Sequence, residues 1–171
     1  PTKLPCTPDL RLTKEMEAHS EKDKQEMAQI PYRSIVGSIL YLQLTRPDIS
    51  YSVSKLSKYL NKPTKTHMKA AMRLLTYLYH THDKCIVYGG KFGKDLFIAG
   101  WSDSDYAGDM DNRKSHTGWI FMLNNGPISW RSVQQSCVAL STPEAEYMAA
   151  SDPAKEARSS LKLAKEIINE R

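Results

Sequence analysis

Long apolar runs, a signal segment and paired cysteines are all missing from this 171-residue chain. No stretch approaches about 18 consecutive apolar residues, which argues against a membrane-spanning helix. The chain opens at Pro1 with neither Met nor a basic-then-apolar leader, so we expect it to be a piece of a longer protein. Its three cysteines are odd in number and far apart, which disfavours a disulfide framework or a zinc site and indicates reduced thiols in an intracellular compartment.

Charge is distributed unevenly along the chain. With 40% hydrophobic and 25% charged residues, the composition is that of a globular protein. Residues 32–94 hold eleven basic and two acidic side chains, a net charge of +9, whereas residues 95–171 hold eight basic and eleven acidic ones, a net charge of −3. A basic half suits a polyanion, and a half with clustered carboxylates suits a metal ion. Ordinary solvated charge is the alternative that composition leaves open.

Residues 32–82 are predicted to form three helices. Apolar residues recur at helical spacing from Tyr32, and the pattern breaks at Arg46-Pro47-Asp48 and again at Asn61-Lys62-Pro63. Residues 1–31, which are rich in proline and charge, are predicted to be an extended arm or linker. The third helix is expected to place these residues on one face: Met68, Ala71, Met72, Leu75 and Tyr79.

Two basic stripes are predicted on these helices, each with its members three or four residues apart and therefore on one helix face. Their lysines and arginine can neutralise phosphates of a nucleic-acid backbone, which gives affinity but little sequence preference. The first stripe is Lys55, Lys58 and Lys62, and the second is Lys65, Lys69 and Arg73.

After Asp83 the hydrophobic pattern changes to that of short strands. Asn124-Asn125-Gly126 is typical of a hairpin turn, and Ser141-Thr142-Pro143-Glu144 is typical of a helix start. The last helix is predicted from Pro143 to near the end, with a kink at Pro153. The order of three helices, an antiparallel meander and a final helix predicts an α+β fold. Candidate strands cover residues 85–88, 96–101, 118–123, 128–131 and 136–140.

Two carboxylates are placed where they could bind a metal ion together. Asp103 follows an apolar strand and Glu146 lies in the first turn of the last helix, so they converge if that helix packs across the meander. Carboxylate oxygens suit Mg²⁺ or Mn²⁺, which can assist phosphodiester hydrolysis. This spacing is common in other proteins and is weak evidence by itself. Asp105, Asp109 and Asp111 are interpreted as solvated loop charges that start turns rather than as metal ligands.

Several segments resemble, in order, the Pol polyprotein of copia-type LTR retrotransposons. The likeness covers roughly residues 32–158, and its separate motifs at compatible spacing make it far more specific than any one of them. The segments are Tyr32–Leu42, Thr45–Ile49, Pro63-Thr64 with His67, Tyr77-Leu78, Trp101–Asp109, Arg113–Ser115, Thr117-Gly118, Ile128–Trp130, Gln135, Val138–Ser141 and Glu144–Ala149.

This resemblance implies two regions with different tasks. Residues 32–94 would be the helical, thumb-like region of a reverse transcriptase, which grips the primer–template duplex. Residues 95–171 would be a partial ribonuclease H-like domain, which cleaves RNA in RNA–DNA hybrids with Mg²⁺ or Mn²⁺. The implied partners are these duplexes, the upstream polymerase and the remainder of the ribonuclease H domain, with no membrane. The implied location is the cytoplasm, in a virus-like particle, or the nucleus.

The same resemblance implies catalytic residues. In that family's fold one catalytic Asp ends the first strand and the catalytic Glu opens the first long helix, positions that match Asp103 and Glu146. A third Asp follows that helix and has no match here. Asp152 points elsewhere around the helix and Glu156 lies far along its axis, so neither is a convincing replacement. We therefore expect this chain alone to be inactive. A non-catalytic nucleic-acid-binding module, a decayed element copy and a structural interaction domain remain as alternatives.

Overall fold

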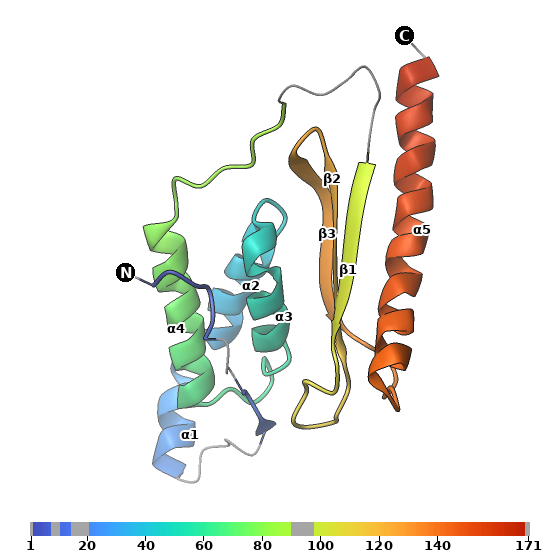
Figure 1. Ribbon diagram of the computed structural model, residues 1–171. Helices are drawn as coiled ribbons and strands as arrows, with labels where there is room; N and C mark the ends of the chain where they lie inside the picture. The colour runs from blue at the N-terminus through green and yellow to red at the C-terminus, as the bar shows by residue number, and fades with distance from the viewer. Residues whose placement is uncertain (1, 8–10, 15–20, 90–97, 170–171) are drawn as a thin grey trace. The chain divides into compact units, whose positions relative to one another are not determined.

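The computed structural model describes residues 2–7, 11–14, 21–89 and 98–169. They belong to two compact units, Pro1–Cys85 and Ile86–Arg171, drawn in Figure 1. The boundary predicted after Lys94 lies outside the described residues. The three cysteines are free thiols. Within the described part of the chain, no helix is both long and apolar enough to cross a lipid bilayer.

The first unit is helical, as its periodicity predicts. Its elements are α1 (Glu21–Ala28), α2 (Tyr32–Leu42), a short 3₁₀ helix (Pro47–Ile49), α3 (Ser50–Ser57) and α4 (Lys65–His80). Their apolar faces meet in one core, to which α2 contributes Val36 and Ile39 and α4 contributes Leu74, each at most 1% exposed. Tyr32 lies in this core with its hydroxyl donating to Leu56 O at 3.0 Å, and burial raises the pKa of that hydroxyl.

The predicted extended arm over residues 1–31 is wrong in part. Residues 21–28 form α1, and Leu12 is buried in the core, where its carbonyl accepts the Tyr59 hydroxyl at 2.6 Å. The sequence pattern does not reveal α1, because the helix has no apolar stripe. Among its described residues, Met27 is the one buried hydrophobic side chain. Contacts with the rest of the unit, rather than periodicity, hold this helix in place.

The buried face of α4 also differs from the predicted one. Met72 and Tyr79 are 47% and 74% exposed, whereas Tyr77 and His67 are buried. His67 closes a capping box with Thr64, in which Nδ1 accepts the Thr64 N–H at 3.0 Å. Polar groups with internal partners therefore occupy positions that a purely hydrophobic pattern assigns to solvent.

A charged cluster ties the break after α2 to the end of α4. Arg46 donates from Nε and Nη2 to both carboxylate oxygens of Asp48, at 2.9 and 2.8 Å. Arg46 Nη1 also donates to Thr81 O at 2.9 Å, and the Tyr77 hydroxyl donates to Asp48 at 2.7 Å. Burial by itself would raise the pKa of Asp48. The hydrogen bonds from Arg46 and Tyr77 have the larger combined effect, so the pKa of Asp48 lies below its usual value.

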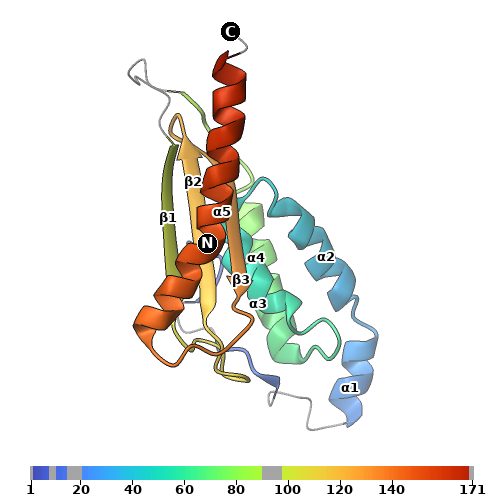
Figure 2. The same cartoon turned by 90° about the vertical axis from the view of Figure 1, so that its right-hand side faces the viewer.

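The second unit is a three-stranded antiparallel sheet with one long helix on it, which confirms the α+β class. The strands are β1 (Ile98–Asp105), β2 (His116–Leu123) and β3 (Gly126–Gln134), in the order β1-β2-β3. Helix α5 (Thr142–Asn169) lies across one face of the sheet, as Figure 2 shows. It continues through Pro153.

The β2–β3 hairpin has the predicted turn. Leu123 pairs with Gly126, so the loop is the two residues between them. Asn124 and Asn125 have φ of 46° and 67°, the left-handed conformation that a two-residue hairpin requires and that asparagine tolerates. The asparagine pair thus fixes the register of the hairpin.

Two of the predicted strands are wrong. Residues 85–88 are not in a strand, although the next residue, Gly89, donates to Asn124 O at 2.9 Å and Tyr88 Oη donates to Pro127 O. Residues 136–140 leave the sheet, and Leu140 is 86% exposed. A short apolar run becomes a strand only where a neighbouring edge supplies its backbone partners, which the run itself does not reveal. The start of the strand predicted from Leu96 lies outside the described residues.

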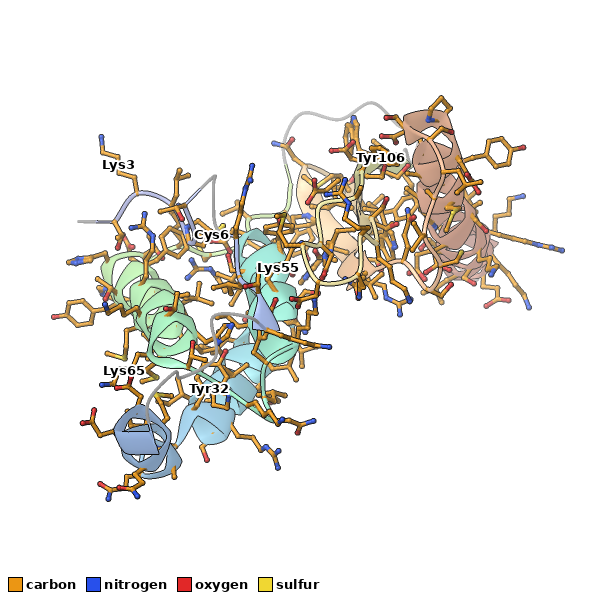
Figure 3. All side chains as sticks on the ribbon, turned by 90° about the horizontal axis from the view of Figure 1, so that it is seen from below. Lys3, Cys6, Tyr32, Lys55, Lys65 and Tyr106 are labelled. Carbon is orange, nitrogen blue, oxygen red and sulfur yellow. The ribbon has the colours of Figure 1, made fainter. Side chains whose placement is uncertain are left out.

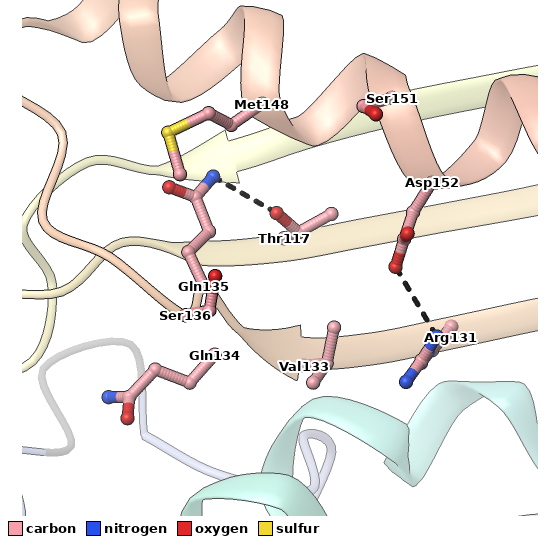
Figure 4. Close-up of a pocket in the computed structure, with 9 residues that line it drawn as sticks. All are labelled: Thr117, Arg131, Val133, Gln134, Gln135, Ser136, Met148, Ser151 and Asp152. Atoms are coloured by element: carbon pink, nitrogen blue, oxygen red, sulfur yellow. Dashed lines mark hydrogen bonds and ion pairs between the residues drawn. The ribbon is translucent and has the colours of Figure 1, made fainter.

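One buried amide fastens α5 to the sheet. Gln135 Nε2 donates to Thr117 Oγ1 on β2 and to Ala145 O in the first turn of α5, both at 3.0 Å (Figure 4 draws the first bond). Ala145 is fully buried beneath this amide. The helix start itself is capped as predicted: Glu144 N donates to Ser141 Oγ at 3.3 Å.

We expect Asp48→Asn to destabilise the first unit by about 1–2 kcal/mol at pH 7, because it removes an ion pair and leaves Arg46 without its carboxylate. Since folding lowers the pKa of Asp48, its contribution is present above the unfolded value of 3.8 and disappears as pH falls through the lower folded value. Urea unfolding at pH 7 and pH 3 measures this: the difference between variant and wild type shrinks at pH 3. Asp83→Asn, at an exposed position, is the control, and an equal loss in both variants would contradict the role of Asp48.

We expect Gln135→Leu to cost about 2–3 kcal/mol, since two buried acceptors lose their donor. Thr117→Val removes only one of these acceptors and should cost less. In a double-mutant cycle followed by urea unfolding, the two changes are expected to be non-additive by at least about 0.5 kcal/mol. Strict additivity would show that the Gln135 amide does not hold the sheet and helix together.

Candidate functional site

Ser104 joins the end of β1 to the start of α5. Its hydroxyl donates to Glu146 Oε1 at 2.9 Å. Directly across from Ser104 on β2 lies Thr117, which accepts the buried Gln135 amide. The sheet face that carries Ser104 and Thr117 is therefore the face that α5 covers.

Asp103 lies one position before Ser104, and successive strand residues point to opposite faces of a sheet. Its side chain therefore belongs to the face that α5 does not cover, where Asp103 is exposed and stands opposite Gly118. The structure brings Ser104, rather than Asp103, to Glu146. No group of three or more His, Cys, Asp or Glu side chains among the described residues could hold a metal ion. The pairing of Asp103 with Glu146 stays a prediction.

Two further acids of α5 are bound to β3. Asp152 Oδ2 accepts from Arg131 Nη1 at 3.3 Å, and Glu156 Oε1 accepts the Ser129 hydroxyl at 2.8 Å. Both acids lie further along α5 than Glu146, and each already binds a side chain of β3. Neither stands in for a third carboxylate at the end of β1.

Asp109 organises the loop between β1 and β2. It is 5% exposed, and its Oδ1 accepts the backbone N–H groups of Asp111 and Asn112 at 2.9 and 3.2 Å. Its other oxygen accepts the Gln134 amide. These bonds confirm that Asp109 forms a turn, but its interpretation as a solvated charge is wrong, because its carboxylate is buried with internal partners. Asp105 packs against Gly108, where any side chain would collide with its carboxylate.

A cavity of about 360 Å³ lies between α5 and the β2–β3 hairpin, on the covered face of the sheet (Figure 4). Gln135 and the Arg131–Asp152 ion pair belong to its wall. Its lining is mixed and shows no set of converging acids. The lining residues are Thr117, Arg131, Val133, Gln134, Gln135, Ser136, Met148, Ser151 and Asp152.

The first basic stripe follows the C-terminal end of α3. The ammonium groups of Lys55 and Lys58 lie over the rings of Tyr51 and Tyr59, at 5.2 and 5.4 Å from their centroids. Only Lys55 lies within α3, which ends at Ser57. Lys58 is the C-cap residue of that helix, and Lys62 is exposed beyond it. The prediction of a single helical face for this stripe is therefore wrong.

The second basic stripe lies on α4 as predicted, with Lys65, Lys69 and Arg73 all on that helix. Lys69 is exposed and Arg73 is half-buried. Lys65 forms ion pairs with Asp23 and Glu26 of α1, at 2.5 and 2.7 Å. Hydrogen bonds to Asp23 and then to Glu26 raise the pKa of Lys65 to about 12.

Sequence reasoning missed the two residues that determine the geometry of the second unit. Ser104 and Gln135 are polar residues at positions that periodicity does not distinguish, and the motifs that contain them do not reveal their partners. Cross-strand pairing and the packing of α5 on the sheet bring their partners to them, from 42 residues away for Ser104 and from 18 and 10 residues away for Gln135.

Comparison with known proteins gives a consistent relationship. The Retrovirus-related Pol polyprotein from transposon TNT 1-94 of Nicotiana tabacum is 45% identical over 157 residues, which are 91% of this chain and 12% of that protein. The corresponding polyprotein from transposon RE2 of Arabidopsis thaliana is 45% identical over 125 residues, 73% of this chain and 8% of that protein. Secreted RxLR effector protein 161 of Plasmopara viticola is 44% identical over 134 residues, 77% of this chain and 92% of that protein.

No protein-family model matches the chain, and no solved structure matches it significantly. The chain spans 12% or less of the two transposon polyproteins. The alignment to the TNT 1-94 polyprotein nonetheless covers 91% of this chain and therefore includes residues of both units. The chain belongs to the Pol polyprotein family of copia-type retrotransposons.

Proposed function

We propose that this segment of a retrotransposon Pol polyprotein binds the primer–template or RNA–DNA duplex through its helical unit. The observation that carries the proposal is the pair Lys62 and Lys69, two exposed cations on either side of the α4 N-terminus with no partner among the described residues. With the other four stripe residues they give a duplex backbone about four to six positive contacts. Point charges of this kind hold phosphates without reading bases.

We also propose that, as part of the longer Pol polyprotein, the second unit contributes Asp103 and Glu146 to metal-dependent cleavage of RNA in hybrids, with Mg²⁺ or Mn²⁺ as the cation. The donor chemistry fits, since carboxylate oxygens are what these ions prefer. The placement does not fit, because Glu146 is bound to Ser104 while Asp103 belongs to the opposite face. We therefore derive no reaction step through a metal for these residues alone.

The alternative of a non-catalytic binding module rests on that same placement. Duplex binding needs only the surface of the first unit, whereas cleavage needs both carboxylates on one ion. The upstream polymerase and the remainder of a ribonuclease H domain are the proposed neighbours in the longer polyprotein, which would act in the cytoplasm, in a virus-like particle, or in the nucleus.

Binding is tested by the salt dependence of affinity for a fluorescent 20-base-pair duplex. The expected slope of log K against log salt is about −4 to −5, and Lys62→Gln/Lys69→Gln should reduce its magnitude by about 2. Lys155→Gln/Lys162→Gln removes the same charge from α5, where both lysines are 80% exposed, and serves as control. A slope near zero, or equal effects of both pairs, would refute the basic stripes as the binding surface.

Cleavage is tested with a labelled RNA–DNA hybrid in Mg²⁺ and in Mn²⁺. We expect the 171-residue polypeptide to cleave no faster than its Asp103→Asn and Glu146→Gln variants, because a two-metal site needs rigid ligands held together. Metal-dependent cleavage that disappears in Asp103→Asn would show that the pair assembles in this chain. That result would also remove the reason to prefer a binding module.

A further inference from the structure

We propose that α1 masks part of the basic surface of the first unit, so that its acidic side chains compete with nucleic-acid phosphates for Lys65. This inference rests on the proposed binding of a duplex by that surface. Asp23 Oδ1 and Glu26 Oε2 both contact the Lys65 ammonium, at 2.5 and 2.7 Å. Figure 3 shows Lys65 beside α1.

The contacted position is one that favours a phosphate. Lys65 is the first residue of a 16-residue helix, whose free N–H groups carry partial positive charge. No acidic residue lies in the first turn of that helix to offset this charge. Lys62 and Lys69 flank the same end. The two carboxylates of α1 therefore meet the cation at a position that also favours a phosphate.

The placement of α1 makes the contact a property of the fold. Asp23 and Glu26 are three residues apart and so share one side of the helix. Met27 is 5% exposed and anchors α1 to the unit. The backbone bonds Gln29 N to Glu26 O and Ile30 N to Met27 O lead directly into α2. The carboxylates are thus held at Lys65 without being buried themselves.

The exposure of the three side chains makes the mask reversible. Lys65, Asp23 and Glu26 are 48%, 37% and 46% exposed. Such surface ion pairs are individually weak and are screened by salt, so a polyanion with many phosphates can displace them. The surface should therefore bind a polyanion with many closely spaced phosphates more strongly than it binds a single anion.

The test compares Asp23→Asn/Glu26→Gln with wild type in binding the fluorescent 20-base-pair duplex. We expect a three- to tenfold higher affinity at low salt, and a log–log salt slope more negative by about 0.9, because Lys65 becomes available to one more phosphate. Asp83→Asn/Glu166→Gln removes the same two charges away from Lys65 and is the matched control. In a Lys65→Gln background, the α1 substitutions should act no more than this control.

The outcomes separate the mask from the binding surface. If the α1 variant and the control change affinity equally while wild type binds, the mask is refuted and the proposed binding stands. If no variant binds the duplex, the proposed binding itself fails and the mask fails with it. Since Asp23 and Glu26 are both more than one third exposed, urea unfolding should give the α1 variant the stability of wild type, which excludes misfolding as the cause of any change.

Discussion

The geometry of the second unit depends on a single buried amide. Gln135 follows the last strand and donates to both β2 and the first turn of α5, so that the helix must begin at one place on the sheet. A buried donor with two acceptors is costly to leave unsatisfied, which makes this arrangement more restrictive than apolar contact alone. Because the helix start is fixed there, Glu146 meets the end of β1, and it meets it at Ser104. This placement of the helix start therefore determines which side chains meet at the candidate site.

In the first unit, a cluster of charged and polar side chains joins segments that are distant in sequence. The chain must leave α2, turn at Pro47 and return beneath α4, and the Arg46–Asp48 pair with Tyr77 and Thr81 joins these segments. The same Arg46-Pro47-Asp48 segment is part of the resemblance to copia-type Pol polyproteins, and the structure gives it an architectural role rather than a chemical one. The basic residues proposed to bind nucleic acid lie outside this network. Stability and the proposed binding therefore depend on different residues, and substitutions of the basic residues should leave the fold intact.

The two units also differ in how directly their sequence relates to the proposed function. Phosphate binding needs only cations on a surface, and Lys62 and Lys69 are exposed in the described residues. Metal-assisted cleavage needs specific side chains on one side of a sheet, and a shift of one residue along a strand reverses the side. Asp103 and Ser104 illustrate this, since neighbours in sequence belong to opposite faces. The relationship to Pol polyproteins covers up to 91% of the chain, while the support for each proposed activity depends on the unit concerned.

The elements whose signals are local can be predicted from the sequence alone. The three helices from Tyr32, the Asn124-Asn125 hairpin turn, the capped start of α5 and the α+β order follow from periodicity, backbone preference and hydrogen bonds between near neighbours. The likeness to copia-type Pol polyproteins was also readable from motifs alone. Contacts between distant segments are instead the reason that residues 21–28 form a helix, that residues 136–140 do not form a strand, and that Lys65 is paired with α1. They also bring Glu146 to Ser104. Each of these depends on which distant group becomes a neighbour, and a pattern along one segment contains no information about the partner that another segment will bring to it.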